Sequence, residues 1–307
     1  MPNPLASWDV PDRLLASDRR LIRAWWYRPQ SRVSPYNIGD ETTSFVLARV
    51  FDITAERVET PNAQLVGAGS ILQNAWTQKT ANPCHIVGSG FVMPQPHRAI
   101  PSHLTVHSVR GYLTRESLDS ERKSAISVGD PGLLASEIAP TRPRRPQFTY
   151  GIIPHISALA AGEWKNTSDL LPNSTMIDVR TNDIMAFLAA MQDCEVIVSQ
   201  SLHGLIFADA LGIPNAWLGD WDAPVRGGNN FKFFDYFSSV GRPAHLMAVR
   251  GPALFKTSVL RNLSEPDCAR IRNVQSDIIS AFDSALADLA EQTSSEPTAT
   301  HGAAHDN

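Results

Sequence analysis

The chain has 307 residues, of which 43% are hydrophobic and 19% charged, a composition typical of a globular protein large enough for two domains. Its formal net charge is −4 and neither half is strongly basic, which argues against nucleic acid as a partner. The cysteines Cys84, Cys194 and Cys268 are odd in number and lack CxxC spacing. We expect them to be reduced, intracellular core residues rather than disulfides or zinc ligands.

The sequence predicts neither a signal peptide nor a membrane span. Residues 1–18 include several aspartates and no apolar run of signal-peptide length, and no run of about 18 apolar residues occurs along the chain. We therefore expect a cytoplasmic protein that does not span the membrane. Residues 291–307 are rich in Ser, Thr, Ala and Glu and are expected to form a disordered tail.

The first half of the chain alternates between apolar runs and small or polar turns. A strand is expected at 21–27 and a helix at 41–50, and further apolar runs occupy 64–66, 84–87, 103–109 and 125–128. Each run ends in residues such as Gly, Ser, Asp or Arg. Parallel α/β sheets gather such loops at the carboxyl ends of their strands, where ligands bind. The pattern predicts a Rossmann-like N-terminal domain over residues 1–140.

A proline-rich segment, Pro-Thr-Arg-Pro-Arg-Arg-Pro at 140–146, is interpreted as a linker. After it, strands are expected at 148–153, 175–179, 194–199 and 215–218, with helices at 183–192 and 265–289. This second set predicts a C-terminal Rossmann-like domain over residues 147–290. The predicted fold class is therefore α/β, with two Rossmann-like domains that face each other across a cleft.

The most informative segment is 194–214, in which a β-branched run stops at Ser199-Gln200-Ser201 and an apolar helix follows with His203 in its first turn. The free N–H groups and positive dipole end of such a helix suit an anion, phosphate or carboxylate. His203 would stand beside that anion. The alternative is a packed βα unit in which the serines only cap the helix and His203 is hydrogen-bonded internally.

Other candidate motifs are less specific. The glycine-rich turns at 67–70 and 88–90 are too short for a dinucleotide fingerprint, and no GxxxxGK[ST] motif occurs. These turns serve either tight chain reversal or close backbone approach to a ligand such as a sugar. The spacing of His97, His103 and His107 suggests a metal site, but no carboxylate stands nearby in sequence, so we interpret them as surface or packed strand histidines.

Several charged groups are expected at one rim of the sheets. The cations among them are Arg110, Arg115, Arg180, His155 and His203. Together they would form a cationic pocket, although each arginine alone is typical of a solvated charge. The carboxylates Asp40 and Asp130 also follow strands. Each could cap a helix, orient an arginine or accept a proton from a hydroxyl group.

Several short segments lie in a characteristic order along the chain: NIGDE at 37–41, GAGSIL at 67–72, GSG at 88–90, VRGYLTR at 109–115, GDP at 129–131, GIIPH at 151–155 and SQSLHGLIFA at 199–208. In this order, they resemble the motifs of the polysaccharide pyruvyl transferase family. They extend from about residue 20 to about residue 220. Ala68 departs from the pattern, because the family commonly has a further glycine at that position.

The resemblance implies a fold like that of the GT-B glycosyltransferases, phosphoenolpyruvate as donor, and a hexose of a bacterial exopolysaccharide or surface polysaccharide as acceptor. The hexose would receive a cyclic pyruvate ketal. By likeness of motif, His203 and Leu202 lie at the donor site, and Arg110 is the candidate donor-binding arginine. We add Ser201, Gly204 and Arg115 to the donor side. Asn37, Gly69 and Ser70 are assigned to the acceptor.

The chemistry of a ketal transfer suits these residue types. Phosphoenolpyruvate carries a carboxylate and a phosphate, so its site needs several donors or cations. Forming the ketal requires an acid and a base, and we expect neither a metal nor a redox cofactor. We assign His203 to the phosphate or to proton donation, Arg110 to an anionic group of the donor, and Asp40 or His155 to hydroxyl deprotonation.

Two alternatives remain open at this point. A glycosyltransferase that uses a nucleotide-sugar would have the same architecture, and a catalytically silent carbohydrate-binding protein could keep the same cleft. The sequence leaves open the acceptor sugar, the ketal position and the oligomeric state. With a lipid-linked acceptor, the enzyme would work at the inner face of the cell membrane without spanning it.

Overall fold

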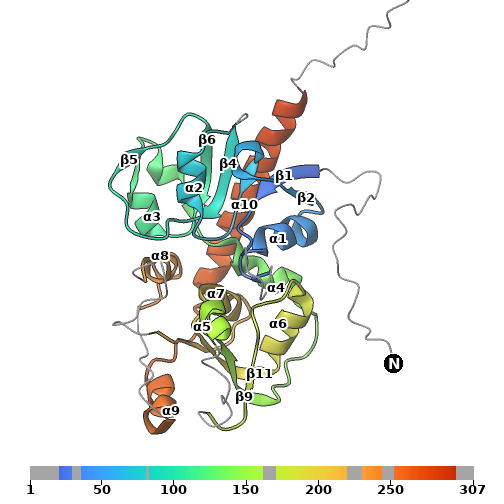
Figure 1. Ribbon diagram of the computed structural model, residues 1–307, viewed down its shortest axis with the longest axis vertical. Helices are drawn as coiled ribbons and strands as arrows, with labels where there is room; N and C mark the ends of the chain where they lie inside the picture. Colours follow the sequence, from blue (N-terminus) through green and yellow to red (C-terminus); the bar gives the residue numbers. More distant parts are fainter. Residues whose placement is uncertain are drawn as a thin grey trace, which may run out of the picture.

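The computed structural model describes residues 21–29, 36–80, 83–161, 171–219, 230–243 and 252–294. The chain is an α/β protein with one six-stranded and one four-stranded sheet, and both are parallel (Figure 1). Residues 1–18, where no signal peptide is expected, and most of the expected tail, residues 295–307, lie outside the described residues.

The six-stranded sheet has the order β2-β1-β3-β4-β6-β8. Its strands are β1 (Leu21–Trp25), β2 (Thr54–Arg57), β3 (Leu65–Val66), β4 (Cys84–Ser89), β6 (Leu104–Val109) and β8 (Ser127–Val128). Its helical elements are α1 (Thr42–Val50), η1 (Thr60–Asn62), α2 (Leu72–Thr77), α3 (Tyr112–Glu116), η2 (Lys123–Ala125), η3 (Pro131–Leu134) and α4 (Ala135–Ile138). Every residue of β4 is buried, as expected for a central parallel strand covered on both faces. A small separate pair joins β5 (Arg98–Ala99) to β7 (Leu118–Asp119).

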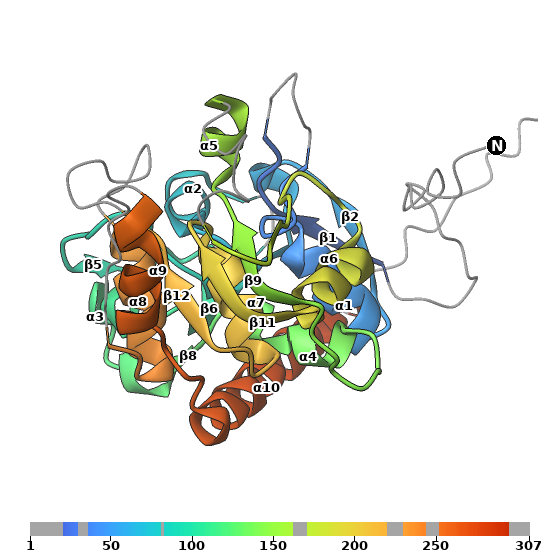
Figure 2. The same cartoon turned by 90° about the horizontal axis from the view of Figure 1, so that it is seen from below.

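The four-stranded sheet has the order β10-β9-β11-β12. Figure 2 shows three of its strands, β9, β11 and β12. Its strands are β9 (Phe148–Ile153), β10 (Ser174–Met176), β11 (Cys194–Ser199) and β12 (Asn215–Trp217). The helices of this half are α5 (Ile156–Ala161), α6 (Ile184–Gln192), α7 (Leu202–Ala210), α8 (Phe231–Val240) and α9 (Pro252–Arg261). The strands expected at 148–153 and 194–199 are confirmed at both ends.

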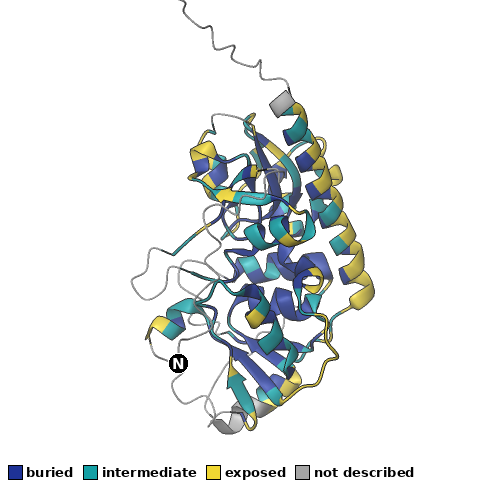
Figure 3. Cartoon of the chain, turned by 90° about the vertical axis from the view of Figure 1, so that its right-hand side faces the viewer, coloured by how far each residue is buried: buried dark blue, intermediate teal, exposed yellow. Residues whose placement is uncertain are grey.

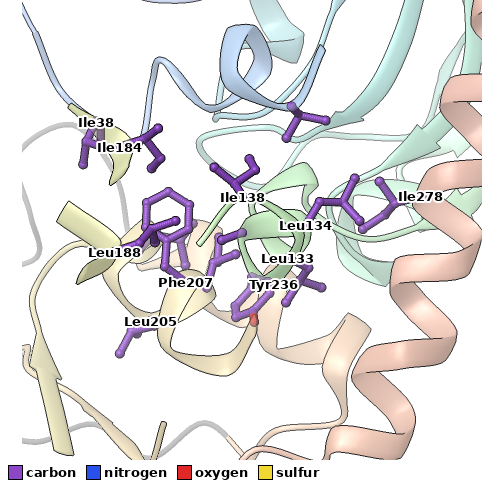
Figure 4. Close-up of a cluster of buried hydrophobic side chains, with 14 of the residues drawn as sticks. Ile38, Leu133, Leu134, Ile138, Ile184, Leu188, Leu205, Phe207, Tyr236 and Ile278 are labelled. Atoms are coloured by element: carbon purple, nitrogen blue, oxygen red, sulfur yellow. The ribbon is translucent and has the colours of Figure 1, made fainter. Parts of the chain in front are cut away.

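One hydrophobic cluster joins the two halves of the chain. It contains Ile38 and Leu133 from the first half and Leu205 and Tyr236 from the second (Figure 4). The elements α1, η3, α4 and α7 meet at this cluster. The two sheets are therefore held against each other by a shared apolar core.

The last helix, α10 (Cys268–Ser294), returns to the first half of the chain and packs against β4, β6, β8 and η3 (Figure 1). Its buried apolar residues are Ile271, Val274, Ile278, Ala281, Phe282, Ala285, Leu286 and Leu289. These positions recur at helical spacing, and the outer face of the helix is exposed (Figure 3). The helix was expected at 265–289. It extends to Ser294, past the point where the disordered tail was expected to begin.

The expected linker at 140–146 contains no regular secondary structure. Its arginines hold it to the second half, because Arg142 donates to the carbonyl oxygen of Ala189 and Arg144 donates to that of Cys194. The division into domains 1–140 and 147–290 stays a prediction, and α10 packs on the first sheet although it follows the linker.

The cysteine prediction is correct for two residues and wrong for the third. Cys84 and Cys194 are buried free thiols, whereas Cys268 is exposed at the start of α10. Cys268 opens a helix whose apolar face begins only at Ile271, so its side chain is left outside the core. In the described residues, no helix combines the length and hydropathy that crossing a bilayer requires.

Candidate functional site

A small cavity, with a volume of about 100 Å³ and open to solvent, is lined by most of the predicted site residues. Its lining residues are Asn37, Asp40, Gly69, Ser70, His155, Ile156, Val179, Ser201, Leu202, His203 and Lys232. Most of these follow the carboxyl ends of parallel strands, namely β1, β3, β9, β10 and β11. Both halves of the chain contribute, as expected for a ligand site in an α/β protein.

The first turn of α7 presents backbone amides at this cavity. Ser201 occupies the N-cap position, but its side chain makes no capping hydrogen bond. The turn is held instead by Ser199, whose hydroxyl group accepts from the Ser201 amide at 3.0 Å and donates to the Ser201 carbonyl oxygen at 2.8 Å. The first-turn N–H groups have no partners within the helix and are available to an anion.

Gly204 supports this turn from behind and does not line the cavity. A Cβ atom at this position would lie 2.3 Å from the Ser199 hydroxyl oxygen. The absence of a side chain therefore lets α7 approach the end of β11.

His203 lies between a buried carboxylate and the loop before α1. Its Nε2 atom is 3.7 Å from Oδ1 of Asp130. Within the described residues, neither this Nε2 nor Oδ2 of Asp130 has a hydrogen-bond partner, and both are buried. On another side of the ring, a Cβ atom at Gly39 would lie 2.4 Å from Nδ1. The ring is thus bounded by Asp130 near Nε2 and by Gly39 near Nδ1, and His203 is one of the residues that line the cavity.

Asp130 itself has a second structural task. Its Oδ1 atom accepts a hydrogen bond from the Gly132 amide at 2.9 Å and caps the short helix η3. The sequence left three roles open for Asp130: capping a helix, orienting an arginine or accepting a proton. This hydrogen bond shows that Asp130 caps a helix.

Asp40 is a half-buried carboxylate that titrates near neutral pH. Burial raises its pKa from 3.8 to about 6, although the charges of His203 and Lys232 act in the opposite direction. Asn37 donates from Nδ2 to Oδ2 of Asp40 at 2.8 Å and orients the carboxyl group. A group with such a pKa can take up and release protons at physiological pH.

His155 is a neutral hydrogen-bond donor. Burial lowers its pKa from 6.5 to about 4, and the charge of Lys232 adds to this effect. Its Nδ1 atom accepts from the Ser157 amide at 3.3 Å and lies 2.7 Å from the Ser157 hydroxyl oxygen. With Nδ1 engaged as an acceptor, the ring proton sits on Nε2. The ring can therefore donate a hydrogen bond through Nε2.

Lys232, in the first turn of α8, is the main site residue that sequence reasoning missed, together with Ile156 and Val179. Burial lowers its pKa from 10.5 to about 8, partly countered by the charge of Asp40. Among the described residues, none forms an ion pair with its ammonium group. The available signal was a single cation in the run Phe231–Val240, which is rich in aromatic residues.

Arg110 stands behind the cavity wall and not in it. It is fully buried and forms an ion pair with Asp235 at 2.9 Å. Its NH2 group also donates to the Phe91 carbonyl oxygen at 2.6 Å, and NH1 donates to the Ser70 hydroxyl oxygen at 2.5 Å. Ser70 lines the cavity, so Arg110 reaches the site through this hydroxyl group.

The glycines of the two short turns also pack closely. A Cβ atom at Gly90 would lie 2.6 Å from the Arg110 guanidinium carbon, so this turn encloses the arginine. Gly69 has a φ of +111°, a conformation that favours glycine, and its backbone lines the cavity. The sequence left two interpretations of these turns open, tight packing of the chain or close approach of the backbone to a ligand. Tight packing applies to the turn at Gly90, whereas the Gly69 backbone lies where a ligand can contact it.

Two other predicted arginines lie outside the cavity lining. Arg115 stacks over the Tyr112 ring at 4.6 Å and donates to the Ile126 carbonyl oxygen at 3.4 Å. Arg180 forms an ion pair with Asp178 at 2.6 Å. The cationic character of the cavity therefore comes from Lys232 and the start of α7.

Comparisons with known proteins identify a family and relatives of this chain. Residues 6–222 match the model of the family described as polysaccharide pyruvyl transferase. The uncharacterized protein L143 of Acanthamoeba polyphaga mimivirus is 33% identical over 219 residues, which cover 68% of this chain and 72% of L143. The succinoglycan biosynthesis protein ExoV of Rhizobium meliloti (strain 1021) is 26% identical over 227 residues, or 72% of this chain and 68% of ExoV. The chain is a transferase and belongs to the polysaccharide pyruvyl transferase family.

Proposed function

We propose that this transferase moves the pyruvyl group of phosphoenolpyruvate onto a hexose of an exopolysaccharide or surface polysaccharide, forming a cyclic pyruvate ketal and releasing phosphate. The observation that carries the proposal is the composition of the cavity. It combines a cation, two imidazoles and an open helix start with a carboxyl group of pKa about 6. The name of ExoV, a succinoglycan biosynthesis protein, supports a polysaccharide as the acceptor.

The donor is assigned to the side of the cavity formed by α7 and α8. Phosphoenolpyruvate carries two anionic groups, and the donors available for them are the Lys232 ammonium group, the Ser201 hydroxyl group with the first-turn amide of Leu202, and the Nε2–H of His155. Arg110 acts as a positioning residue, because its guanidinium group is already bonded to Asp235 and orients Ser70.

The reaction needs one proton delivered to carbon and two hydroxyl protons removed. The methylene carbon of the donor gains a proton, and one sugar oxygen bonds to the central carbon as its hydroxyl proton leaves. The bond from the central carbon to the phosphate oxygen then breaks, and phosphate departs with the electron pair. The second sugar oxygen bonds to the same carbon and loses its proton, which closes the ketal. One of the two hydroxyl protons balances the proton gained by the methylene carbon, and the other leaves on the phosphate. The three proton transfers call for a general acid and a general base.

His203 and Asp40 are suited to these two tasks. As an imidazolium ion, His203 would donate a proton to the methylene carbon, and the buried Asp130 carboxylate beside Nε2 would stabilise its charge. Asp40 would accept the hydroxyl proton, since its pKa of about 6 leaves it ionised and basic near neutral pH. We favour Asp40 over His155 as the base because Nδ1 of His155 is held by Ser157.

The acceptor is assigned to the side formed by the first half of the chain. Asn37, Gly69 and Ser70 offer an amide, a backbone and a hydroxyl group, which are the groups that bind sugar hydroxyls. With this assignment, the hexose approaches Asp40 from one half while the donor is held by the other. No metal or redox cofactor is required by this chemistry.

We further propose that the two parallel sheets form Rossmann-like domains that face each other across this cavity, as in GT-B enzymes. The lining of the cavity by both halves supports this arrangement. A cytoplasmic location, at the inner membrane face if the acceptor is lipid-linked, is supported by the buried free thiols of Cys84 and Cys194.

The test is a donor-dependence assay with the full chain. The protein is incubated with phosphoenolpyruvate and a panel of hexose oligosaccharides, free and lipid-linked, and phosphate and product masses are measured. We expect phosphate release that depends on an acceptor, together with the mass gain of a pyruvate ketal. Use of a nucleotide-sugar with release of nucleoside diphosphate would identify a glycosyltransferase instead. Binding of oligosaccharide without turnover of either donor would identify a carbohydrate-binding protein.

A further inference from the structure

A second cluster of titratable side chains lies on the six-stranded sheet, and none of its members lines the cavity. Nδ1 of His85 and Nε2 of His107 are 2.9 Å apart. Oδ2 of Asp288 lies 3.8 Å from the first of these atoms and 3.7 Å from the second. His85 is buried, His107 is partly buried, and Asp288 is about half exposed. Three potential metal ligands therefore converge on one point at the sheet surface.

The fold brings these residues together from distant parts of the sequence. His85 lies on β4, and His107 lies on the neighbouring strand β6, where the register shifts so that Val106 pairs with Ile86 and Ser108 with Val87. The shift leaves His107 without a partner across the strands, and such bulges re-aim side chains. The helix α10, which covers these strands, supplies Asp288. Sequence spacing grouped His107 with His97 and His103 and therefore missed the carboxylate.

The separations between the three atoms fit a tetrahedral metal ion. Zinc bonds to imidazole nitrogen and carboxylate oxygen at about 2.0–2.2 Å, which places neighbouring ligand atoms roughly 3.3 Å apart. The observed separations of 2.9, 3.7 and 3.8 Å bracket that value.

We propose that His85, His107 and Asp288 form a binding site for a divalent metal of the zinc type, which clasps the end of α10 to strands β4 and β6. The exposed side of Asp288 leaves room for a water molecule as the fourth ligand. None of these three residues takes part in the proposed transfer reaction, so this proposal does not depend on the proposed function.

Gln292 is placed to support this site from one turn further along α10. Its side-chain amide lies 3.1 Å from Nε2 of His85. With Nδ1 of His85 on the metal, Nε2 carries the ring proton and needs an acceptor, which the amide oxygen of Gln292 supplies after a flip of the amide group. Gln292 thus fixes the orientation of the ring that binds the metal.

The test measures Zn²⁺ binding to the full chain and to three variants. Asp288→Asn and His107→Gln each remove one ligand at a position that is not fully buried, and Asp283→Asn changes an exposed carboxylate on the same helix as a matched control. The metal content after gel filtration and the dissociation constant by calorimetry are determined for each. We expect the parent chain and Asp283→Asn to retain one Zn²⁺, and the two ligand variants to bind at least about tenfold more weakly.

Hydrogen exchange tests the clasp itself. Zn²⁺ should slow amide exchange at the end of α10 in the parent chain and in Asp283→Asn, but not in Asp288→Asn. The proposal is overturned if the parent chain retains no more Zn²⁺ than Asp288→Asn, or if Asp283→Asn loses it equally. If the parent chain bound one Zn²⁺ but amide exchange along α10 were no slower, the proposal that the metal holds the end of α10 to strands β4 and β6 would be overturned.

Discussion

Gly39 faces the His203 ring so closely that a Cβ atom at this position would lie 2.4 Å from Nδ1. Gly39 belongs to the loop before α1, whereas His203 opens α7 in the other half of the chain. On the Nε2 side, the ring is bounded by Asp130 at 3.7 Å. The two halves of the molecule therefore fix the position of this imidazole together.

Gly39→Ala should lower turnover by displacing the His203 ring. His203→Ala removes the proposed acid and should cut kcat by roughly 10²–10⁴-fold while the fold persists. If Gly39 acts only through this ring, the double variant Gly39→Ala/His203→Ala should have a kcat within about twofold of that of His203→Ala. Steady-state kinetics measures this ratio. His97→Ala, an exposed histidine outside the cavity, is the control and should keep its rate. A near-normal rate for His203→Ala would withdraw its catalytic role.

Asp40→Asn should abolish the rise of kcat/KM with pH. Because the pKa of Asp40 is about 6, the ionised base forms only as the pH rises through that value. The rate of the parent enzyme should therefore increase through about pH 6, and the variant should be slow and flat. Asp119→Asn, an exposed carboxylate outside the cavity, should keep the parent profile. A rising limb that survives in Asp40→Asn would assign the base elsewhere.

Asp40→Asn should also increase the stability of the folded state near neutral pH. The folded carboxyl group holds its proton up to about pH 6, whereas the unfolded one releases it near its ordinary pKa of 3.8. Its contribution to stability is therefore present below 3.8 and is lost as the pH rises through about 6. Asp40→Asn, which is always neutral, should melt a few degrees higher than the parent chain at pH 7, and by less at pH 4. An unchanged difference at the two pH values would contradict this origin.

Lys232→Met should weaken binding of phosphoenolpyruvate more than it slows the chemical step. A charge-assisted contact to an anion contributes about 1.5–3 kcal/mol, so KM should rise by roughly 10–100-fold. Since burial lowers the pKa of Lys232 to about 8, the parent enzyme should also lose donor affinity as the pH rises through 8, and the variant should not. Lys123→Met removes an exposed ion pair with Glu116 and serves as the control. An unaltered KM would remove Lys232 from the donor site.

Replacing Arg110 should lower the free energy of unfolding much more than replacing Arg115. Arg110→Met leaves the buried Asp235 carboxylate without its ion pair, which should destabilise the fold by about 3–5 kcal/mol in urea unfolding. Arg115→Met removes a side chain that is about one-fifth exposed and should change stability by no more than about 1 kcal/mol. If Arg110→Met instead kept its stability and only raised the KM for the donor, Arg110 would be a direct ligand.

Local patterns in the sequence were enough to predict the strands and the helix that place the site. The β-branched run and polar turn before His203 predicted β11 and the start of α7, and the cavity contains His203 together with Asp40, His155 and Ser201. These residues follow strands, and parallel strands bring their carboxyl ends to one edge. The juxtaposition thus follows from the direction of the strands.

Side-chain direction and long-range packing could not be predicted in the same way. Lys232 reaches the cavity from α8, and the sequence contains no motif that relates it to α7. Arg110 follows β6 as predicted, but Asp235, far along the chain, binds its guanidinium group. His85 and His107 meet because of a register shift that spacing alone does not reveal. In each case the deciding contact joins residues widely separated in sequence.

The return of α10 to the first sheet has a consequence for biosynthesis. Strands β4, β6 and β8 leave the ribosome long before the helix that covers them, so their apolar face stays open until residues 268–294 have been made. A polypeptide that stops short of this helix would display Val128 and its neighbours to the surrounding medium. The N-terminal half can therefore complete its folding only after translation has reached the end of α10, and early termination should produce an aggregation-prone fragment.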